Sequence, residues 1–183
     1  MLKIAITGNI AAGKSEVEKI IAQDFPVFDA DKIAHKFLGN VDRRALGEKV
    51  FSDPAERKKL EEYIHPKVKD EILKIFSESK DKCVFVSIPL LFETGFDKLF
   101  DKIIFVQCDD ELRLKRLMKR NNFTKIQALK RMNSQLPQDE KIKKSDFVIH
   151  NNSSKEELSV QVENVITYFK TLYTLALIAF SHV

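Results

Sequence analysis

The chain has few of the residues that mark several other protein classes. Its 183 residues include two cysteines, Cys83 and Cys108, too few for the disulfide framework of a small secreted domain. We therefore expect free thiols and a cytoplasmic protein. Five glycines and five prolines exclude a collagen-like or low-complexity chain. The apolar run 172–180 is shorter than the ~20 residues that cross a membrane, so membrane attachment is only a minor alternative.

The composition is typical of a globular protein, and its net charge indicates an anionic partner. Charged residues make up 32% of the chain and hydrophobic residues 44%, and the length suits one domain. The formal net charge of +4 indicates an anionic partner, either a polymer or a small molecule. The four histidines show no metal-ligand spacing.

Short apolar runs alternate with segments of helical periodicity along the chain. Strands are expected at 3–7, 27–28, 83–88, 103–106 and 146–149. Helices are expected at 15–22, 32–38, 42–50, 55–77, 110–121, 124–135 and 154–179. Pro66 is expected to break or kink the helix that contains it. The alternation predicts a three-layer, doubly wound α/β fold with a five-stranded parallel sheet.

A phosphate-binding loop is predicted at residues 8–15. The string Gly8-Asn9-Ile10-Ala11-Ala12-Gly13-Lys14-Ser15 matches G-x-x-x-x-G-K-[ST] between a predicted strand and a predicted helix. The two glycines let backbone N–H groups turn toward an anion, and the helix adds its positive end. We expect Lys14 to reach the β- and γ-phosphates of a nucleoside triphosphate and Ser15 to contact Mg²⁺. The alternative is a tight turn without a ligand.

Two aspartates follow the second predicted strand. Asp29 and Asp31 are two residues apart, so they share a face if the strand continues, at the edge of the sheet where ligands bind. Asp31 could accept a proton from an attacking hydroxyl, or it could cap the helix that starts at Lys32. The sequence favours neither reading, and the two are compatible.

Arginines form a stripe on the basic helix 110–121. Arg113, Arg116 and Arg120 lie at positions i, i+3 and i+7, and Arg131 lies in the next predicted helix. We interpret Arg113 as part of a solvated charged face. The other three are expected to be lid residues that cover a transferring phosphoryl group. A regulatory GTPase is disfavoured because the sequence has no N-K-x-D string.

Successive blocks of the chain resemble the dephospho-CoA kinase family. The blocks are residues 8–15, 29–34, 42–47, 60–66, 89–93, 131–135 and 145–151. The resemblance covers residues 2 to about 165 and implies Mg²⁺-dependent transfer of the γ-phosphoryl of ATP to the ribose 3′-hydroxyl of dephospho-CoA, the last step of coenzyme A synthesis. It implies a fold similar to nucleoside monophosphate kinases, with helical CoA-binding and lid insertions.

The resemblance also implies a division of the single kinase domain 1–183. The core would comprise about 1–31, 81–112 and 141–170, with a CoA-binding helical region at about 32–80 and a lid at about 113–140.

The same resemblance implies roles for individual residues. Asp31 would be the general base, assisted in catalysis by Lys14 and Arg131. Nucleotide-binding residues would be Gly8, Asn9, Ile10, Ala11, Ala12, Gly13, Lys14, Ser15, Glu16, Arg116, Arg120 and Asn151. Substrate contacts would come from Asp31, Ala34, His65, Pro89 and Leu90, and the metal contact from Ser15. A structural hydrogen-bonding role for His65 is the alternative to substrate contact.

Several positions depart from the family pattern. Ala11 and Ala12 stand where glycine or serine is usual, and Glu16 stands where threonine is usual. Ser87 ends the third strand where many members have aspartate, which shifts a metal contact toward Ser15 and Asp31. Only residues 39–41 separate Leu38 from Asp42, where the family has a longer connection.

Two other functions remain open at this point. The chain could be a kinase for another nucleotide or nucleoside. The basic region 113–131 could instead belong to a regulatory or nucleic-acid-binding protein. We expect dephospho-CoA and ATP as partners, no nucleic acid, and a monomer or small homo-oligomer.

Overall fold

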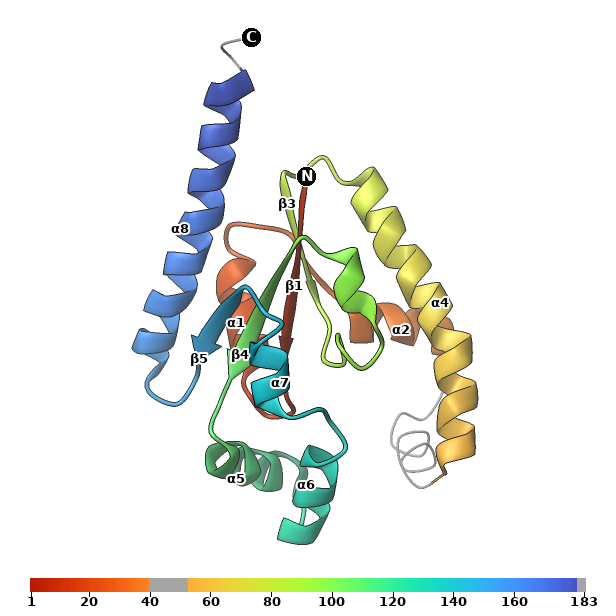
Figure 1. The fold of residues 1–183 in the computed structure, drawn as a ribbon. Helices are drawn as coiled ribbons and strands as arrows, with labels where there is room; N and C mark the ends of the chain where they lie inside the picture. Colours follow the sequence, from red (N-terminus) through yellow and green to blue (C-terminus); the bar gives the residue numbers. More distant parts are fainter. Residues whose placement is uncertain (40–52, 181–183) are drawn as a thin grey trace. The chain divides into compact units, whose positions relative to one another are not determined.

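A computed structural model describes residues 1–39 and 53–180 (Figure 1). It forms two compact units, residues 1–28 with 80–183, and residues 29–79. The helix expected at 42–50 and most of the short connection after Leu38 lie outside the described residues. None of the described helices is long and apolar enough to cross a membrane.

The first unit is built on a five-stranded sheet. The strands are β1 (Leu2–Gly8), β2 (Val27–Asp29), β3 (Cys83–Ser87), β4 (Lys102–Gln107) and β5 (Phe147–His150). Their order is β2-β3-β1-β4-β5. β1 pairs in parallel with β3 and β4, and β4 pairs in parallel with β5. The predicted doubly wound parallel sheet is therefore confirmed.

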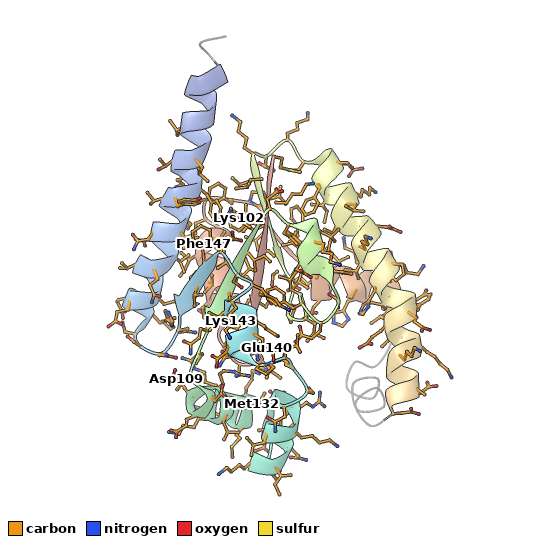
Figure 2. The ribbon with its side chains drawn as sticks, in the orientation of Figure 1. Lys102, Asp109, Met132, Glu140, Lys143 and Phe147 are labelled. Carbon is orange, nitrogen blue, oxygen red and sulfur yellow. The ribbon has the colours of Figure 1, made fainter. Side chains whose placement is uncertain are left out.

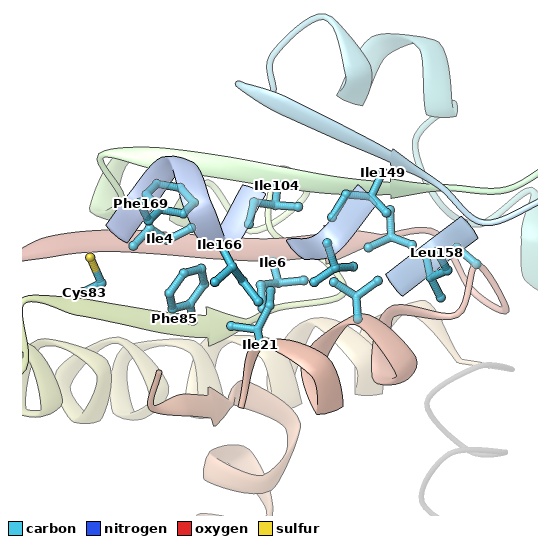
Figure 3. Packing of buried hydrophobic residues seen from close by; sticks show 14 of the residues in the cluster. Ile4, Ile6, Ile21, Cys83, Phe85, Ile104, Ile149, Leu158, Ile166 and Phe169 are labelled. Atoms are coloured by element: carbon cyan, nitrogen blue, oxygen red, sulfur yellow. The ribbon is translucent and has the colours of Figure 1, made fainter. Parts of the chain in front are cut away.

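A core of apolar side chains joins one face of this sheet to two helices. The helices are α1 (Lys14–Ile21) and α8 (Lys155–Phe180), which contact each other. Figure 3 shows the cluster, in which Phe85 of β3 meets Phe169 of α8 edge to face at 5.5 Å between ring centroids. Both rings are fully buried, and burial of each contributes about 1.5–3 kcal/mol. This packing fixes α1, and with it the loop that precedes α1.

Short helices follow the carboxyl ends of β3 and β4. They are the 3₁₀ turn η1 (Phe96–Leu99) and α5 (Asp110–Asn121), α6 (Lys125–Met132) and α7 (Gln138–Ile142). In Figure 1, α5 and α6 extend beyond the carboxyl edge of the sheet. The helix expected at 124–135 ends earlier, at Met132, and α7 begins directly after Pro137. Neither η1 nor α7 was expected from the sequence, because both are too short to show a periodicity.

The second unit contains α2 (Ala30–Leu38) and α4 (Pro54–Glu78), which pack against each other. Asp53 caps α4 by accepting hydrogen bonds from the N–H groups of Ala55 and Glu56. The helix continues through Pro66, so of the expected break or kink the break is wrong, and the kink stays a prediction. A proline removes one backbone hydrogen bond, and a helix of 25 residues retains its other bonds on both sides.

Candidate active site

The phosphate loop runs from the end of β1 to the start of α1. Neighbouring atoms lie so close to its two glycines that neither position has room for a side chain. A Cβ on Gly8 would lie 2.8 Å from the carbonyl oxygen of Val106. Gly13 has a φ of +93°, and a Cβ there would lie 1.9 Å from Nδ2 of Asn151. Ala11 has a positive φ of 63° although it is not glycine. The motif therefore has the backbone conformation of an anion-binding loop.

Two side chains and one backbone carbonyl from distant parts of the sequence hold the loop. Asn151 donates from Nδ2 to the carbonyl oxygen of Ala12 at 2.8 Å, and Asn9 donates from Nδ2 to the carbonyl oxygen of Leu136 at 3.0 Å. The N–H of Ile10 donates to Oε1 of Gln135 at 2.7 Å. Asn151, predicted to contact nucleotide, thus has its amide on the loop itself.

Arg113 is a further support for the loop, and its predicted place on a solvated face is wrong. Its side chain is only 3% exposed. Nε donates to the carbonyl oxygen of Ile10 at 3.0 Å, and Nη1 lies 2.6 Å from Oδ1 of Asp110. Burial lowers the pKa of Arg113, and Asp110 partly opposes that effect. Helical periodicity identified the stripe but not which of its arginines turns inward.

Lys14 lies in a closed cluster of three polar side chains. Its Nζ donates to Oε1 of Glu18 at 2.6 Å and to Oγ of Ser87, and Ser87 donates to the same carboxylate oxygen at 2.5 Å. Ser87 is fully buried, and the Lys14 and Glu18 side chains are 16% and 17% exposed. The sequence analysis missed Glu18. Its only signal was the i, i+4 spacing from Lys14.

The two residues of α1 that follow Lys14, Ser15 and Glu16, are more open. Ser15 is exposed in the first turn of the helix. Glu16 pairs with Lys19 at 2.7 Å, and this hydrogen bond lowers the pKa of Glu16. The negative charge that departs from the family pattern is thus neutralised along the surface of α1.

The arginines of the predicted lid have different partners. Arg116 donates from Nη2 to the carbonyl oxygen of Asn151 at 3.2 Å and from Nη1 to Sγ of Cys108 at 3.3 Å. Arg120 is exposed and donates to Oδ1 of its neighbour Asn121. Arg131 lies over the ring of Phe123 at 5.7 Å. The structure therefore brings Arg116 next to the phosphate loop. The contacts of Arg120 and Arg131 given above are with residues of α5 and of the turn between α5 and α6.

A buried ion pair lies after β3, where Pro89 and Leu90 were predicted to contact substrate. Pro89 accepts a hydrogen bond from Oγ1 of Thr7 at 3.4 Å, and Leu90 accepts from Thr94. Oε1 of Glu93 lies 2.7 Å from Nζ of Lys141, which is fully buried on α7, and accepts from the N–H of Leu136. Sequence reasoning took Glu93 only as part of a motif and missed Lys141.

The predicted general base belongs to the second unit. β2 ends at Asp29, whose Oδ1 accepts from the N–H groups of Asp31 and Lys32 and caps α2. The expected shared face of Asp29 and Asp31 on one strand is therefore wrong, and the helix cap is Asp29 rather than Asp31. Asp31 is exposed in the first turn of α2. Ala34 on α2 and His65 on α4 are half-buried.

The donor set fits a magnesium ion that is bound mainly through phosphates. Among residues 1–39 and 53–180, no three His, Cys, Asp or Glu side chains gather as a metal site. Mg²⁺ commonly takes few protein ligands and binds through substrate phosphates and water. The exposed Ser15 hydroxyl at the start of α1 suits such a contact.

A parallel sheet with this loop between β1 and α1, and with arginine-bearing helices after β4, defines a P-loop kinase. Solved kinases share the fold. A shikimate kinase from Acinetobacter baumannii superposes with a TM-score of 0.62 at 14% identity, covering 93% of this chain and 94% of that chain.

Closer relatives give the family. The dephospho-CoA kinase family model (CoaE) matches residues 36–157. The dephospho-CoA kinase of Listeria innocua is 43% identical over 192 residues, covering 91% of this chain and 96% of the relative. The solved dephospho-CoA kinase from Campylobacter jejuni is 34% identical, with a TM-score of 0.69, covering 91% and 96% of the two chains. The chain belongs to the dephospho-CoA kinase family, which confirms the resemblance.

This chain is shorter than its relative inside the matched region. The alignment with the Listeria innocua protein spans 192 positions, whereas 91% of 183 residues is about 167, so about 25 positions lack a counterpart here. A shortened connection after Leu38 is one place for them, and it stays a prediction.

Proposed function

We propose that this protein transfers the γ-phosphoryl group of ATP to the ribose 3′-hydroxyl of dephospho-CoA, giving coenzyme A and ADP. Membership of the dephospho-CoA kinase family carries this proposal, together with a complete G-x-x-x-x-G-K-[ST] loop in an anion-binding conformation. The two buried free thiols support a reducing, cytoplasmic compartment.

Binding of the triphosphate would rest on the loop and the start of α1. Backbone N–H groups of the loop and the helix dipole attract the phosphates, and the Lys14 ammonium adds a full charge. Mg²⁺, held by Ser15 and the phosphates, would neutralise charge on the β- and γ-oxygens. Arg116 lies beside Asn151 and Cys108, where its guanidinium would meet the nucleotide. Arg120 and Arg131 would act from the α5–α6 pair as it closes.

The acceptor side would depend on Asp31. Its carboxylate is exposed at the start of α2, two residues beyond the end of β2, and would orient and deprotonate the 3′-hydroxyl. Ala34 and His65 of the second unit, with Pro89 and Leu90, would contact the rest of dephospho-CoA. Because phosphoryl transfer needs little covalent chemistry from the protein, most of the rate enhancement would come from positioning and charge neutralisation.

A coupled ADP-release assay tests the proposal. Dephospho-CoA is compared with a panel of nucleosides and nucleotides at fixed ATP, with and without Mg²⁺. We expect ADP release to need both dephospho-CoA and Mg²⁺, and Lys14→Ala to abolish most of it. A protein without stimulation by dephospho-CoA, or a fully active Lys14→Ala variant, would refute the assignment.

A further inference from the structure

The Lys14 side chain has two polar partners, and these partners define the direction of its stem. A lysine has a flexible four-carbon stem whose immobilisation costs about 2 kcal/mol of rotamer entropy. Here the ammonium has two partners at once, a carboxylate on α1 and a hydroxyl at the end of β3. Its stem therefore has one preferred direction, toward the carboxyl edge of β3.

The charges around this ammonium require an anion. Lys14 is the first residue of α1, at the positive end of the helix dipole, and it is only 16% exposed. A mostly buried cation at that end is unfavourable unless a negative charge is close by. Glu18, one helical turn further on, supplies that charge at 2.6 Å.

Ser87 fixes the carboxylate in turn. A hydroxyl has one proton to donate and lone pairs to accept. Ser87 uses both capacities, donating to Oε1 of Glu18 and accepting from Nζ of Lys14. Since Ser87 is fully buried at the end of a central strand, it ties the Glu18–Lys14 pair to the rigid sheet.

We propose that Glu18 is a positioning residue for phosphoryl transfer: anchored by Ser87, it is the counter-ion that holds the Lys14 ammonium where it meets the phosphates. This inference rests on the proposed function. Glu18 acts through Lys14 and does not touch substrate.

The expected kinetic effect is on turnover more than on ATP affinity. Loss of the Glu18 carboxylate frees the Lys14 stem, so the ammonium no longer meets the charge that develops in the transition state. In the ground state two effects oppose each other. A less ordered Lys14 weakens ATP binding, whereas removal of a negative charge near the phosphates strengthens it. We therefore expect Glu18→Ala to lower kcat about tenfold, with the KM for ATP changed less than about threefold.

Moving the negative charge from α1 to β3 distinguishes two roles of Glu18, positioning of Lys14 and structural support of α1. The double variant Glu18→Ala/Ser87→Asp removes the carboxylate on α1 and places one at the end of β3, where the Ser87 hydroxyl contacts Lys14 in wild type. We expect kcat to return to within about threefold of wild type. Glu163→Ala is the matched control, because this exposed carboxylate accepts from a serine hydroxyl on α8 at 3.0 Å.

The kinetic outcomes that overturn the proposal are specific. A Glu18→Ala variant with kcat within twofold of wild type shows that Lys14 needs no counter-ion. A loss that Ser87→Asp does not restore shows that Glu18 only supports the helix. If Glu18→Ala does not fold, Glu18→Gln, which keeps the size and removes the charge, is read by the same criteria.

A second measurement does not depend on the acceptor. The side-chain NMR signal of Lys14 in selectively ¹³C-labelled protein, assigned by its loss in Lys14→Arg, reports the ammonium's surroundings without nucleotide. We expect Glu18→Ala to move it toward the exposed lysines, and Glu18→Ala/Ser87→Asp to reverse most of that shift. An unmoved signal overturns the positioning role. Wild type that is inactive on dephospho-CoA refutes the proposed function alone.

Discussion

Lys141 and Glu93 form a buried ion pair. Among the substitutions that we consider, replacing Lys141 should give the largest loss of stability. The Lys141 side chain is 0% exposed and lies 2.7 Å from a carboxylate that is 17% exposed. Lys141→Met keeps the length of the side chain but leaves Glu93 mostly buried without its cation. Removal of one partner of a buried pair costs about 3–5 kcal/mol. Because Glu93 keeps the N–H of Leu136 as a donor, we expect the lower end, about 3 kcal/mol.

Thermal unfolding measures this loss. For a chain of this length, about 3 kcal/mol corresponds to a fall in Tm of about 6–12 °C. Lys143→Met is the matched control, since Lys143 directly follows the same helix and is exposed (labelled in Figure 2). We expect it to change stability by less than about 0.5 kcal/mol. Lys141→Met/Glu93→Gln should recover at least half of the loss, because the glutamine still accepts from Leu136. A single variant that loses less than about 1 kcal/mol, or a double variant without recovery, refutes the reasoning.

The same pair predicts a dependence on pH. Burial lowers the pKa of Lys141, and the Glu93 carboxylate partly opposes that effect. Between this lowered pKa and the ordinary value of about 10.4, the unfolded chain binds more protons at this residue than the folded chain. The free energy of unfolding of wild type should therefore rise with pH through that window relative to Lys141→Met. Urea unfolding at several alkaline pH values checks the sign, and equal slopes for the two proteins would contradict it.

Three further changes probe the phosphate loop and the acceptor side. Gly13→Ala should weaken ATP binding more than about tenfold, measured by calorimetry. Residue 13 has a φ of +93°, and the added Cβ would lie 1.9 Å from Nδ2 of Asn151. Unchanged affinity would show that the loop adapts. Asn151→Ala should lower the free energy of unfolding in urea by about 1–3 kcal/mol, since the Ala12 carbonyl loses its donor. An unchanged free energy would mean that water replaces the amide. Asp31→Asn should lower kcat by about 100-fold or more with ATP affinity nearly unchanged, and equal turnover would exclude the general-base role.

The fold and the phosphate loop could be predicted because their signals are local. The five strands and the loop string depend on short runs of residues, and the structure has these elements within one or two residues of the predictions. The partners that hold the loop are not local. Gln135, Leu136 and Asn151 contact the loop from more than 120 residues away, and no spacing rule in one sequence relates them to it.

Errors at single residues have the same origin. The pattern placed Arg113, Arg116 and Arg120 on one stripe, but it could not tell that α5 turns Arg113 toward the Ile10 carbonyl. Asp29 and Asp31 were compared as neighbours on a strand, whereas the chain enters α2 immediately after Asp29. In each case a tertiary contact or a change of backbone conformation decided which way the side chain lies.

The origin of the phosphate affinity follows from how the cations near the loop are paired. The formal net charge of +4 indicated an anionic partner. Three of the relevant cations instead have internal carboxylate partners: Arg113 pairs with Asp110, Lys141 with Glu93 and Lys14 with Glu18. Of these, only Lys14 lies in the phosphate-binding motif. Attraction of ATP therefore comes from the loop N–H groups, the α1 dipole and the Lys14 ammonium, which under the proposed positioning role keeps its Glu18 contact while it meets the phosphates.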